Sequence, residues 1–459
     1  MSRKLSLPVD DESSDIIKRY EKFLSGDAKG YFDVEEMESI VEYYLRRGRT
    51  SDCSKALELG LQLHPNSNAL KTKRAKIYLA TGDNQKAYRI LDTLSESTDY
   101  EVILLKIEVL LKLERTEEAR LKSDQLLIDE KEDLANVALD IAFIFIGQGD
   151  YELALSYLLK GDEFDKRNTD LLYELAFCYE QCARFDEALV TYNRIIDIDS
   201  FSGEAWFNLG QIQFAMQNFT DALEAYEFAL AIDENDSLSW LQKAHACFQL
   251  DRFEDAIDAY KEYGLLTNTQ WETFIFVAEC YEKLERFEDA IENYKLSLNF
   301  QAENYDALTG IAICLLDQEK YAESIPYIEK ALEVNPEASD AWVYLAEALI
   351  GIDDINLALA SYLKAISIDP EQPETLMAIA NIYLEKGLYD QAIDYYKSGL
   401  ILDETLEFAN LFVAVAYMKK QDYADSLYYL KKAMEQNPAA LELFQELCPE
   451  TLTDDPNEL

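Results

Sequence analysis

Residues 203–236 read GEAWFNLGQIQFAMQNFTDALEAYEFALAIDEND, and this stretch decides the fold. Its apolar residues recur at spacings of three, four and seven, which place them on one face of a helix. When the chain is shifted by 34 residues it matches itself without insertion over nine units. Those units begin at Ala135, Thr169, Gly203, Ser237, Trp271, Tyr305, Ser339, Pro373 and Glu407. A fixed period of this length predicts an all-helical array of stacked helix pairs.

Two recurring positions in the second half of each unit predict how its helices pack. A small residue stands where two helices must approach closely, at Ala188, Ala222, Ala256, Ala290, Ala358 and Ala392. An aromatic residue follows four places later, at Tyr192, Tyr226, Tyr260, Tyr294, Tyr362 and Tyr396. Because residues four apart share a helix face, these tyrosines are predicted to be core residues rather than a binding stripe.

The repeat resembles the tetratricopeptide repeat (TPR), whose marks are W-x2-L-G, then A-x3-F, then a final Pro. In the quoted unit the first marks are held by Trp206, Leu209, Gly210, Ala222 and Tyr226, and Glu234 takes the place of the final Pro. The resemblance implies a right-handed superhelical α-solenoid, here of about twelve helix–turn–helix units with a capping helix at each end. We expect an N-terminal tail and capping helix over 1–36 and three irregular units over 37–134. Nine regular units over 135–440 and a capping helix with an acidic tail over 441–459 complete the expected organisation.

Charge limits the classes of partner. The chain of 459 residues has 42 Lys and Arg against 89 Asp and Glu, a net charge of -47, and most of the excess falls in 135–459. Nucleic acids and anionic membranes are therefore not expected as partners, since both need clustered basic residues. No apolar run is long enough for a signal peptide or a membrane span, and the seven cysteines suit a reducing compartment. These features favour a cytoplasmic protein.

No pattern of reactive residues predicts chemistry. The chain has no nucleotide-binding glycine motif, no zinc-protease motif and no calcium-binding loop. Cys178, Cys280 and Cys314 share one repeat position where small apolar residues belong, so they are predicted to be core cysteines. We therefore expect no catalytic residue, no cofactor and no metal site, and we expect that the protein is not an enzyme.

The resemblance implies that the first helix of each unit lines a concave surface where partners bind. On that helix the second, fifth, sixth, ninth and twelfth places are not needed for the core. From the unit at Thr169 onward these places are rich in aromatic and acidic residues, which predicts a groove for a polypeptide with apolar anchors and basic flanks. The predicted partner-binding residues are Tyr173, Glu174, Phe177, Phe207, Asn208, Gln211, Phe214, Leu241, His245, Phe248, Ile275, Phe276 and Glu279.

Two known binding modes of the family do not fit these residues. The clamp for the acidic C-terminal tails of heat-shock chaperones needs Lys, Arg and Asn on three successive first helices. Asn208 fills one of these places, but Tyr173 and Leu238 stand at others. An asparagine ladder would need Asn at the sixth place of many units. We therefore expect a non-catalytic protein–protein interaction scaffold. The alternatives are a structural subunit or co-chaperone of a larger assembly, and an enzyme or small-ligand-binding regulator.

Overall fold

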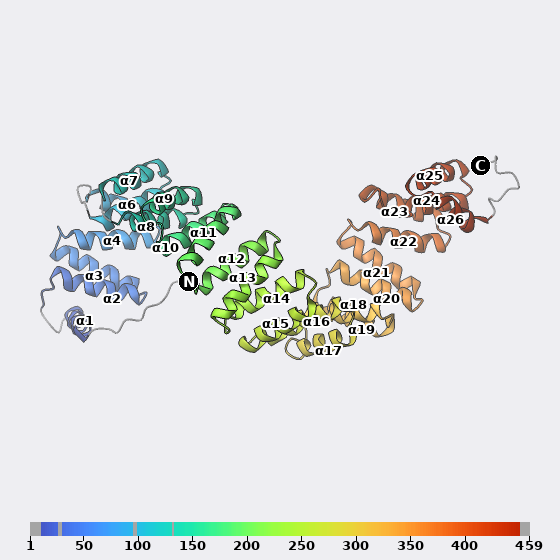
Figure 1. The fold of residues 1–459 in the computed structure, drawn as a ribbon, viewed down its shortest axis with the longest axis horizontal. Coiled ribbons are helices and arrows are strands. Elements are labelled where there is room, and N and C mark those ends of the chain that lie inside the picture. The colour runs from blue at the N-terminus through green and yellow to red at the C-terminus, as the bar shows by residue number, and fades with distance from the viewer. Residues whose placement is uncertain (1–10, 26–29, 95–98, 131–132, 450–459) are drawn as a thin grey trace. The chain divides into compact units, whose positions relative to one another are not determined.

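The protein is all-α in the part of the chain that the computed structural model describes, residues 11–25, 30–94, 99–130 and 133–449. These residues form 26 helices, and no strand occurs among them (Figure 1). Contacts divide the chain into two units, Met1–Asn218 and Phe219–Leu459, and each is described by itself. The predicted N-terminal tail (1–10) and the end of the predicted acidic tail (450–459) lie outside the described residues.

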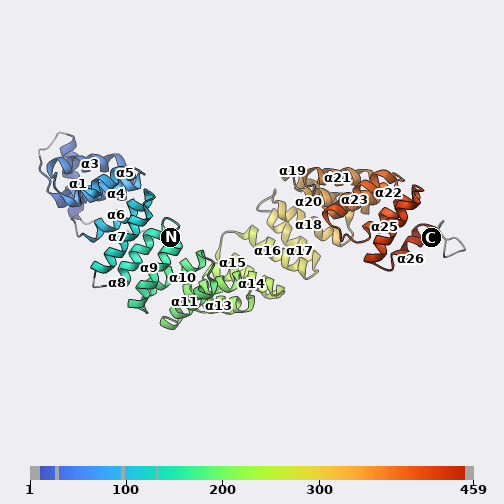
Figure 2. The same ribbon diagram turned by 90° about the horizontal axis from the view of Figure 1, so that it is seen from above.

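In the first unit the helices follow one another as sequential neighbours, seen from a second side in Figure 2. They are α1 (Asp11–Leu24), α2 (Val34–Arg46), α3 (Thr50–Leu63), α4 (Asn68–Ala80), α5 (Asn84–Asp92), α6 (Tyr100–Lys112), α7 (Thr116–Asp129), α8 (Leu134–Ile146), α9 (Tyr151–Phe164), α10 (Thr169–Gln181), α11 (Phe185–Ile198) and α12 (Gly203–Ala215).

The second unit continues the same alternation. Its helices are α13 (Phe219–Ile232), α14 (Ser237–Gln249), α15 (Phe253–Leu266), α16 (Gln270–Lys283), α17 (Phe287–Leu298), α18 (Tyr305–Asp317), α19 (Tyr321–Val334), α20 (Ser339–Gly351), α21 (Ile355–Ile368), α22 (Pro373–Glu385), α23 (Tyr389–Leu402), α24 (Ala409–Lys419), α25 (Tyr423–Gln436) and α26 (Ala440–Leu447). In sequence, α2 to α25 make the twelve successive helix pairs that the repeat predicts. The predicted division at residue 134 stays a prediction.

The predicted core positions are confirmed. Ala188, Ala256 and Ala290 are fully buried, as expected where two helices approach closely. The tyrosine four residues later is also buried, with Tyr192, Tyr260 and Tyr294 each 3% exposed. Most of the aromatic content at this place therefore serves packing.

One tight turn joins the two helices of each regular pair. Its central residue has a left-handed backbone and recurs every 34 residues, at Gly149, Ala183, Gln217, Asp251, Glu285, Glu319, Asp353, Gly387 and Gln421. Glycine adopts this conformation without a Cβ clash, whereas other residues are strained there. The repeat therefore tolerates strain at most of its turns, since only two of these nine residues are glycine.

This turn gives a first stability prediction. Gly149 has a φ of +78° and open space where a Cβ would lie, so Gly149→Ala should cost about 1 kcal/mol through backbone strain alone. Ala183 has a φ of 55°, so Ala183→Gly should be neutral or stabilising. Hydrogen exchange in α8–α11 measures both effects. Equal protection in the two variants would contradict this account of the turn.

Side chains also close the junctions between pairs. A side-chain oxygen of an Asp or Asn accepts a hydrogen bond from the backbone N–H two residues later. The accepting residues are Asp165, Asp199, Asp233, Asn335, Asp369, Asp403 and Asn437. The indole N–H of Trp240 donates to the Glu234 carbonyl at 2.9 Å, and that of Trp342 donates to Pro336 at 3.0 Å. The recurring tryptophan thus holds the junction between consecutive helix pairs.

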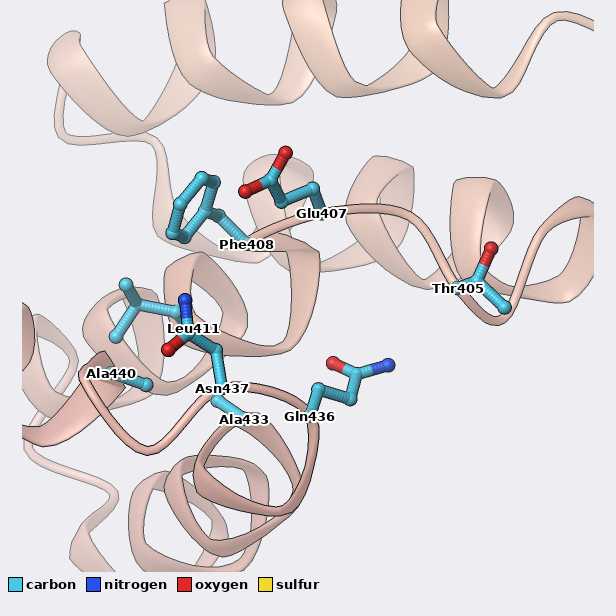
Figure 3. A pocket seen from close by; sticks show the side chains of 8 residues that line it. All are labelled: Thr405, Glu407, Phe408, Leu411, Ala433, Gln436, Asn437 and Ala440. Atoms are coloured by element: carbon cyan, nitrogen blue, oxygen red, sulfur yellow. The ribbon is translucent and has the colours of Figure 1, made fainter.

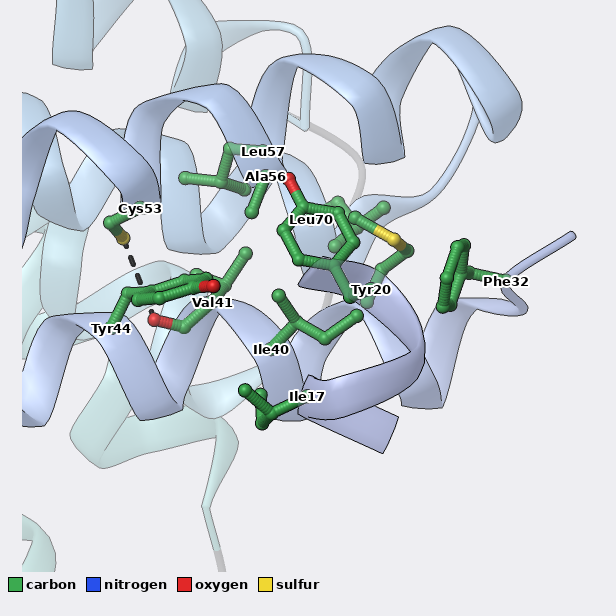
Figure 4. Close-up of a cluster of buried hydrophobic side chains, with 11 residues drawn as sticks. Ile17, Tyr20, Phe32, Ile40, Val41, Tyr44, Cys53, Ala56, Leu57 and Leu70 are labelled. Atoms are coloured by element: carbon green, nitrogen blue, oxygen red, sulfur yellow. Dashed lines mark hydrogen bonds between the residues drawn. The ribbon is translucent and has the colours of Figure 1, made fainter. Parts of the chain in front are cut away.

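Capping helices cover both ends of the array, as predicted. On α1, Tyr20 is fully buried, and its ring lies edge-on to that of Phe32 with 5.6 Å between the ring centroids. Both rings belong to a core cluster that includes Ile40 and Leu70 (Figure 4). At the other end Phe444 of α26 packs with Leu411 and Val415 of α24. The apolar first helix of the last repeat is therefore covered by the capping helix. None of the helices in the described ranges is long and apolar enough to span a bilayer.

Candidate functional site

The first helices of successive repeats are neighbours, because α16 contacts α18 and α18 contacts α20. We call the helix-A face the surface formed by the second, fifth, sixth, ninth and twelfth residues of each repeat, counted from the starting residues given above. This is the surface on which the predicted binding residues lie. Its two parts, in 1–218 and in 219–459, are described separately.

On α10 the predicted residues combine an open ring with two half-buried side chains. Phe177 is 36% exposed, and its ring lies edge-on to Tyr151 at 6.0 Å. The Tyr173 hydroxyl lies 2.6 Å from the Ser202 hydroxyl, so this side chain is fixed in place. Glu174 is half-buried, and burial raises the pKa of its carboxyl. An aromatic surface and a desolvated acid therefore stand together on this helix.

On α12 the four predicted residues share one degree of burial. Each is half-buried, so each keeps part of its side chain accessible to solvent: Phe207, Asn208, Gln211 and Phe214. A continuous track from these residues onto the first helices of 219–459 stays a prediction.

On α14 and α16 the predicted aromatic residues pack against the repeat as well as facing outward. Phe276 stacks on buried Tyr260 at 4.9 Å, and the His245 ring meets both rings edge-on at 5.6 Å. Phe248 packs edge-on against Phe253 at 5.3 Å, and Leu241 is half-buried. Phe276 is therefore partly a packing residue, which the sequence-based assignment of the sixth place to the open surface did not anticipate.

Ile275 is the clearest correction to the predicted set. This side chain is 5% exposed and belongs to a core cluster with Ala278, Ala290 and Tyr294. The fifth place is buried in other repeats too, since Leu139 is 7% exposed. A residue at this place lies three before the small eighth residue, on the helix side that faces its partner helix. Ile275 is therefore a core residue and is left out of the surface proposed below.

The carboxyl groups whose pKa is raised by burial lie on the helix-A face. They are Glu174 and Glu180 on α10, Glu279 and Glu282 on α16, and Glu347 on α20. Burial disfavours the charged form of an acid unless a cation compensates it. By contrast, the guanidinium of Arg184, the residue before α11, donates to Glu187 and lowers the pKa of that carboxyl. The acids of the helix-A face are thus short of positive partners.

Glu279 has the most strongly raised pKa among these acids. Burial and the neighbouring Glu282 and Asp306 carboxylates raise its pKa to about 7, and Lys283 opposes them. The side chain is exposed, so Glu279 lies at the surface and not in the core. A cationic group placed beside it would favour the charged form of the carboxyl.

Two tyrosine–glutamate pairs at equivalent repeat positions were not in the predicted set. The Tyr294 hydroxyl donates to Glu282 at 3.1 Å, and the Tyr192 hydroxyl donates to Glu180 at 2.5 Å. Each pair joins the twelfth and twenty-fourth places of its repeat. The sequence contains a signal for them, because only these two regular repeats have an acid at the twelfth place. Beside Tyr294 stands Gly310, where an added Cβ would lie only 2.3 Å from the ring.

The second unit also has a cavity away from these residues. It has a volume of about 400 Å³ and lies between the start of α24, the end of α25 and the start of α26 (Figure 3). Its lining includes Glu407, Phe408 and Leu411, with Phe408 in a left-handed backbone conformation at φ 60°. No residue of the predicted binding set lines this cavity.

The reactive side chains of the described chain are placed as packing groups. Cys178, Cys280 and Cys314 are fully buried, and burial raises the pKa of each thiol to about 12. The Nε2 atom of His64 lies 2.8 Å from the Phe32 carbonyl oxygen. Within the described residues no group of three His, Cys, Asp or Glu side chains could hold a metal ion.

The helix pairs, their period and their turns define a helical repeat scaffold. Models described as tetratricopeptide repeat match residues 145–211, 203–236, 238–263, 309–373 and 375–407. The protein belongs to the tetratricopeptide repeat family. The comparison with curated proteins finds no match.

Several solved structures resemble the chain at low identity. The MamA protein is 19% identical with a TM-score of 0.36, over 38% of this chain and 96% of that one. The C-terminal part of a TPR repeat-containing protein from Cytophaga hutchinsonii is 17% identical with a TM-score of 0.44, over 51% and 98%. A chain of the APC/C hetero-tetramer Cut9-Hcn1 is 14% identical with a TM-score of 0.38, over 88% and 98%. Likeness at this level says nothing about a shared partner.

Proposed function

We propose that this protein is a non-catalytic scaffold whose helix-A face binds a polypeptide segment carrying apolar anchors and flanking Lys or Arg. The observation that carries the proposal is the group of acids on that face whose pKa is raised, Glu279, Glu282 and Glu347 in 219–459. A basic side chain placed beside them would stabilise their charged forms. The tetratricopeptide repeat fold supports a protein partner.

The proposed contact residues lie in both units, and in each unit they include aromatic side chains. In 1–218 the proposed contact residues are Tyr173, Glu174, Phe177, Phe207, Asn208, Gln211 and Phe214. In 219–459 they are Leu241, His245, Phe248, Phe276 and Glu279, to which we add Glu282, Tyr344 and Glu347. Half-buried aromatic rings suit this role because their packing holds them rigid, so little conformational entropy is lost on binding.

The negative charge of the chain also excludes several classes of partner. A chain with a net charge of -47 repels nucleic acids, anionic membranes and the acidic C-terminal tails of heat-shock chaperones. The proposal includes no catalytic residue, cofactor or metal ion. The cytoplasmic location expected from the sequence stays a prediction.

A site-specific photo-crosslinker tests the proposal. The reactive side chain is introduced at Tyr344, at the sixth place on α20, and in a matched variant at Leu357, which is 55% exposed on α21. In native lysate, position 344 should capture one recurring segment that contains both apolar and Lys or Arg residues, and position 357 should not. Equal capture at the two positions, or capture of acidic segments at 344, would refute the proposal.

A further inference from the structure

Another cavity in 219–459 lies between the second helices of the last two repeats. It has a volume of about 670 Å³ and is lined by residues of α23, of α25 and of the stretch between 404 and 410. Lys397 and Ile401 reach it from α23, and Lys432 reaches it from α25. No residue of the helix-A face lines it. We call this cavity the lysine groove.

Aromatic rings hold both lysines in place. The Lys397 ammonium donates to the Tyr417 hydroxyl at 2.7 Å and lies 5.3 Å from the centre of the Tyr429 ring. The Lys432 ammonium lies 4.9 Å from the centre of the Tyr428 ring and 5.7 Å from that of Tyr429. Because the face of a tyrosine ring attracts a cation, these contacts limit the freedom of both side chains. Two ammonium groups are therefore held near one ring that lines the groove.

Within the described part of the chain, neither lysine forms an ion pair with a carboxylate. This is notable because Asp and Glu outnumber Lys and Arg by 89 to 42. By contrast, Lys420, which directly follows α24, pairs with Asp390 at 2.6 Å. An anion that enters the lysine groove therefore has no existing carboxylate to displace from Lys397 or Lys432.

The corresponding cavity of an earlier repeat has the opposite charges at the same places. That cavity lies between α13 and α15 and has a volume of about 450 Å³. The places of Lys397 and Lys432 in the repeat are held there by Glu227 and Glu262. Its cation Lys243 is paired, since it lies 3.0 Å from Glu227. Unpaired lysines are therefore a property of the lysine groove and not of the repeat as such.

We propose that the lysine groove binds a polypeptide segment that carries a single acidic side chain between apolar residues. The carboxylate lies between Lys397 and Lys432, and an apolar neighbour covers Ile401, which is 83% exposed. Charge complementarity favours one carboxylate over a polyanion, because Glu404 and Glu435 also line the groove and repel further negative charge. Acids elsewhere on the chain are largely screened beyond about 8 Å at physiological salt. The groove is separate from the helix-A face, so this inference does not depend on the proposed function.

The binding test uses a short fluorescent peptide in which one glutamate is flanked by leucines and both termini are blocked. Anisotropy measures its affinity for the full-length wild type and for Lys432→Met, which removes the charge and keeps an apolar chain. We expect about fivefold weaker binding in the variant, the upper size for an exposed ion pair. A peptide with glutamine in place of glutamate should bind the wild type more weakly and should be insensitive to Lys432→Met.

Two further variants complete the test. Lys420→Met is the matched control, because it changes the net charge equally outside the groove and should bind as the wild type does. Ile401→Ser removes the exposed apolar contact and should weaken the binding of both peptides. The thermal midpoints of Lys432→Met and Ile401→Ser should stay near that of the wild type, since both side chains are exposed.

Three results would overturn the inference. The first is no binding of the glutamate peptide, or equal affinity of the wild type for the two peptides. The second is an equal loss in Lys432→Met and Lys420→Met, because net charge alone would then explain the binding. The third is a wild-type dimer in sedimentation velocity that Lys432→Met does not form, since a second copy of this chain would then occupy the groove in place of a separate segment.

Discussion

Gly310→Ala is expected to lower the free energy of unfolding by about 3 kcal/mol, the upper range for overpacking a core. A Cβ at this position would lie 2.3 Å from Cζ of Tyr294. That ring is 3% exposed and its hydroxyl donates to Glu282, so it cannot swing aside without losing a partly buried hydrogen bond. A single methyl group must therefore displace a packed tyrosine.

The damage from Gly310→Ala should be local. Each repeat is stabilised mainly by its neighbours, so hydrogen-exchange protection should fall in α16 to α19 and persist in α22 to α25. Tyr294→Leu removes the clashing ring, so the double variant should lose less stability than the sum of the two single variants. Additive losses, or a Gly310→Ala variant as stable as wild type, would show that the ring and the glycine do not compete for this space.

Reversal of charge on the helix-A face should weaken partner binding by about a hundredfold. Glu279→Lys with Glu347→Lys removes two attractions and places two cations where the partner's Lys or Arg would lie, a change of about 3 kcal/mol. The matched control is Glu292→Lys with Glu323→Lys, two exposed acids on α17 and α19, which changes the net charge equally. The control should bind almost as well as wild type, and higher salt should narrow the gap between the variants. Equal loss in both pairs would mean that net charge alone, and no particular face, attracts the partner.

Periodicity made most of the fold predictable. A repeat of 34 residues without insertion fixes the phase of each helix, so the buried place of Tyr260 or Ala256 follows from that of its counterparts. The phase also places the turn at Ala183, although alanine does not itself favour a left-handed backbone. The junction hydrogen bonds were not predicted, because an Asp at a helix end can equally cap or face water.

The candidate site was less predictable because burial at its margins depends on neighbouring side chains. Ile275 and Phe276 are consecutive, yet one is in the core and the other is half-exposed above Tyr260. In the sequence Glu279 is one acid among many, so the sequence does not single it out. Burial raises its pKa most, Glu282 and Asp306 raise it further, and Asp306 belongs to another repeat. Such proximity across repeats is a property of the folded chain.

A charge-swap experiment tests the central claim, contact between the helix-A face and a basic segment, most directly. The partner arginine or lysine nearest the crosslink at position 344 is changed to glutamate, and calorimetry measures binding to wild type and to Glu347→Lys. Either single change should weaken binding about tenfold or more, and the two together should restore most of the affinity, as expected for charges in contact. If the double variant instead binds more weakly than either single one, Glu347 does not contact that residue and the proposed helix-A interface is wrong.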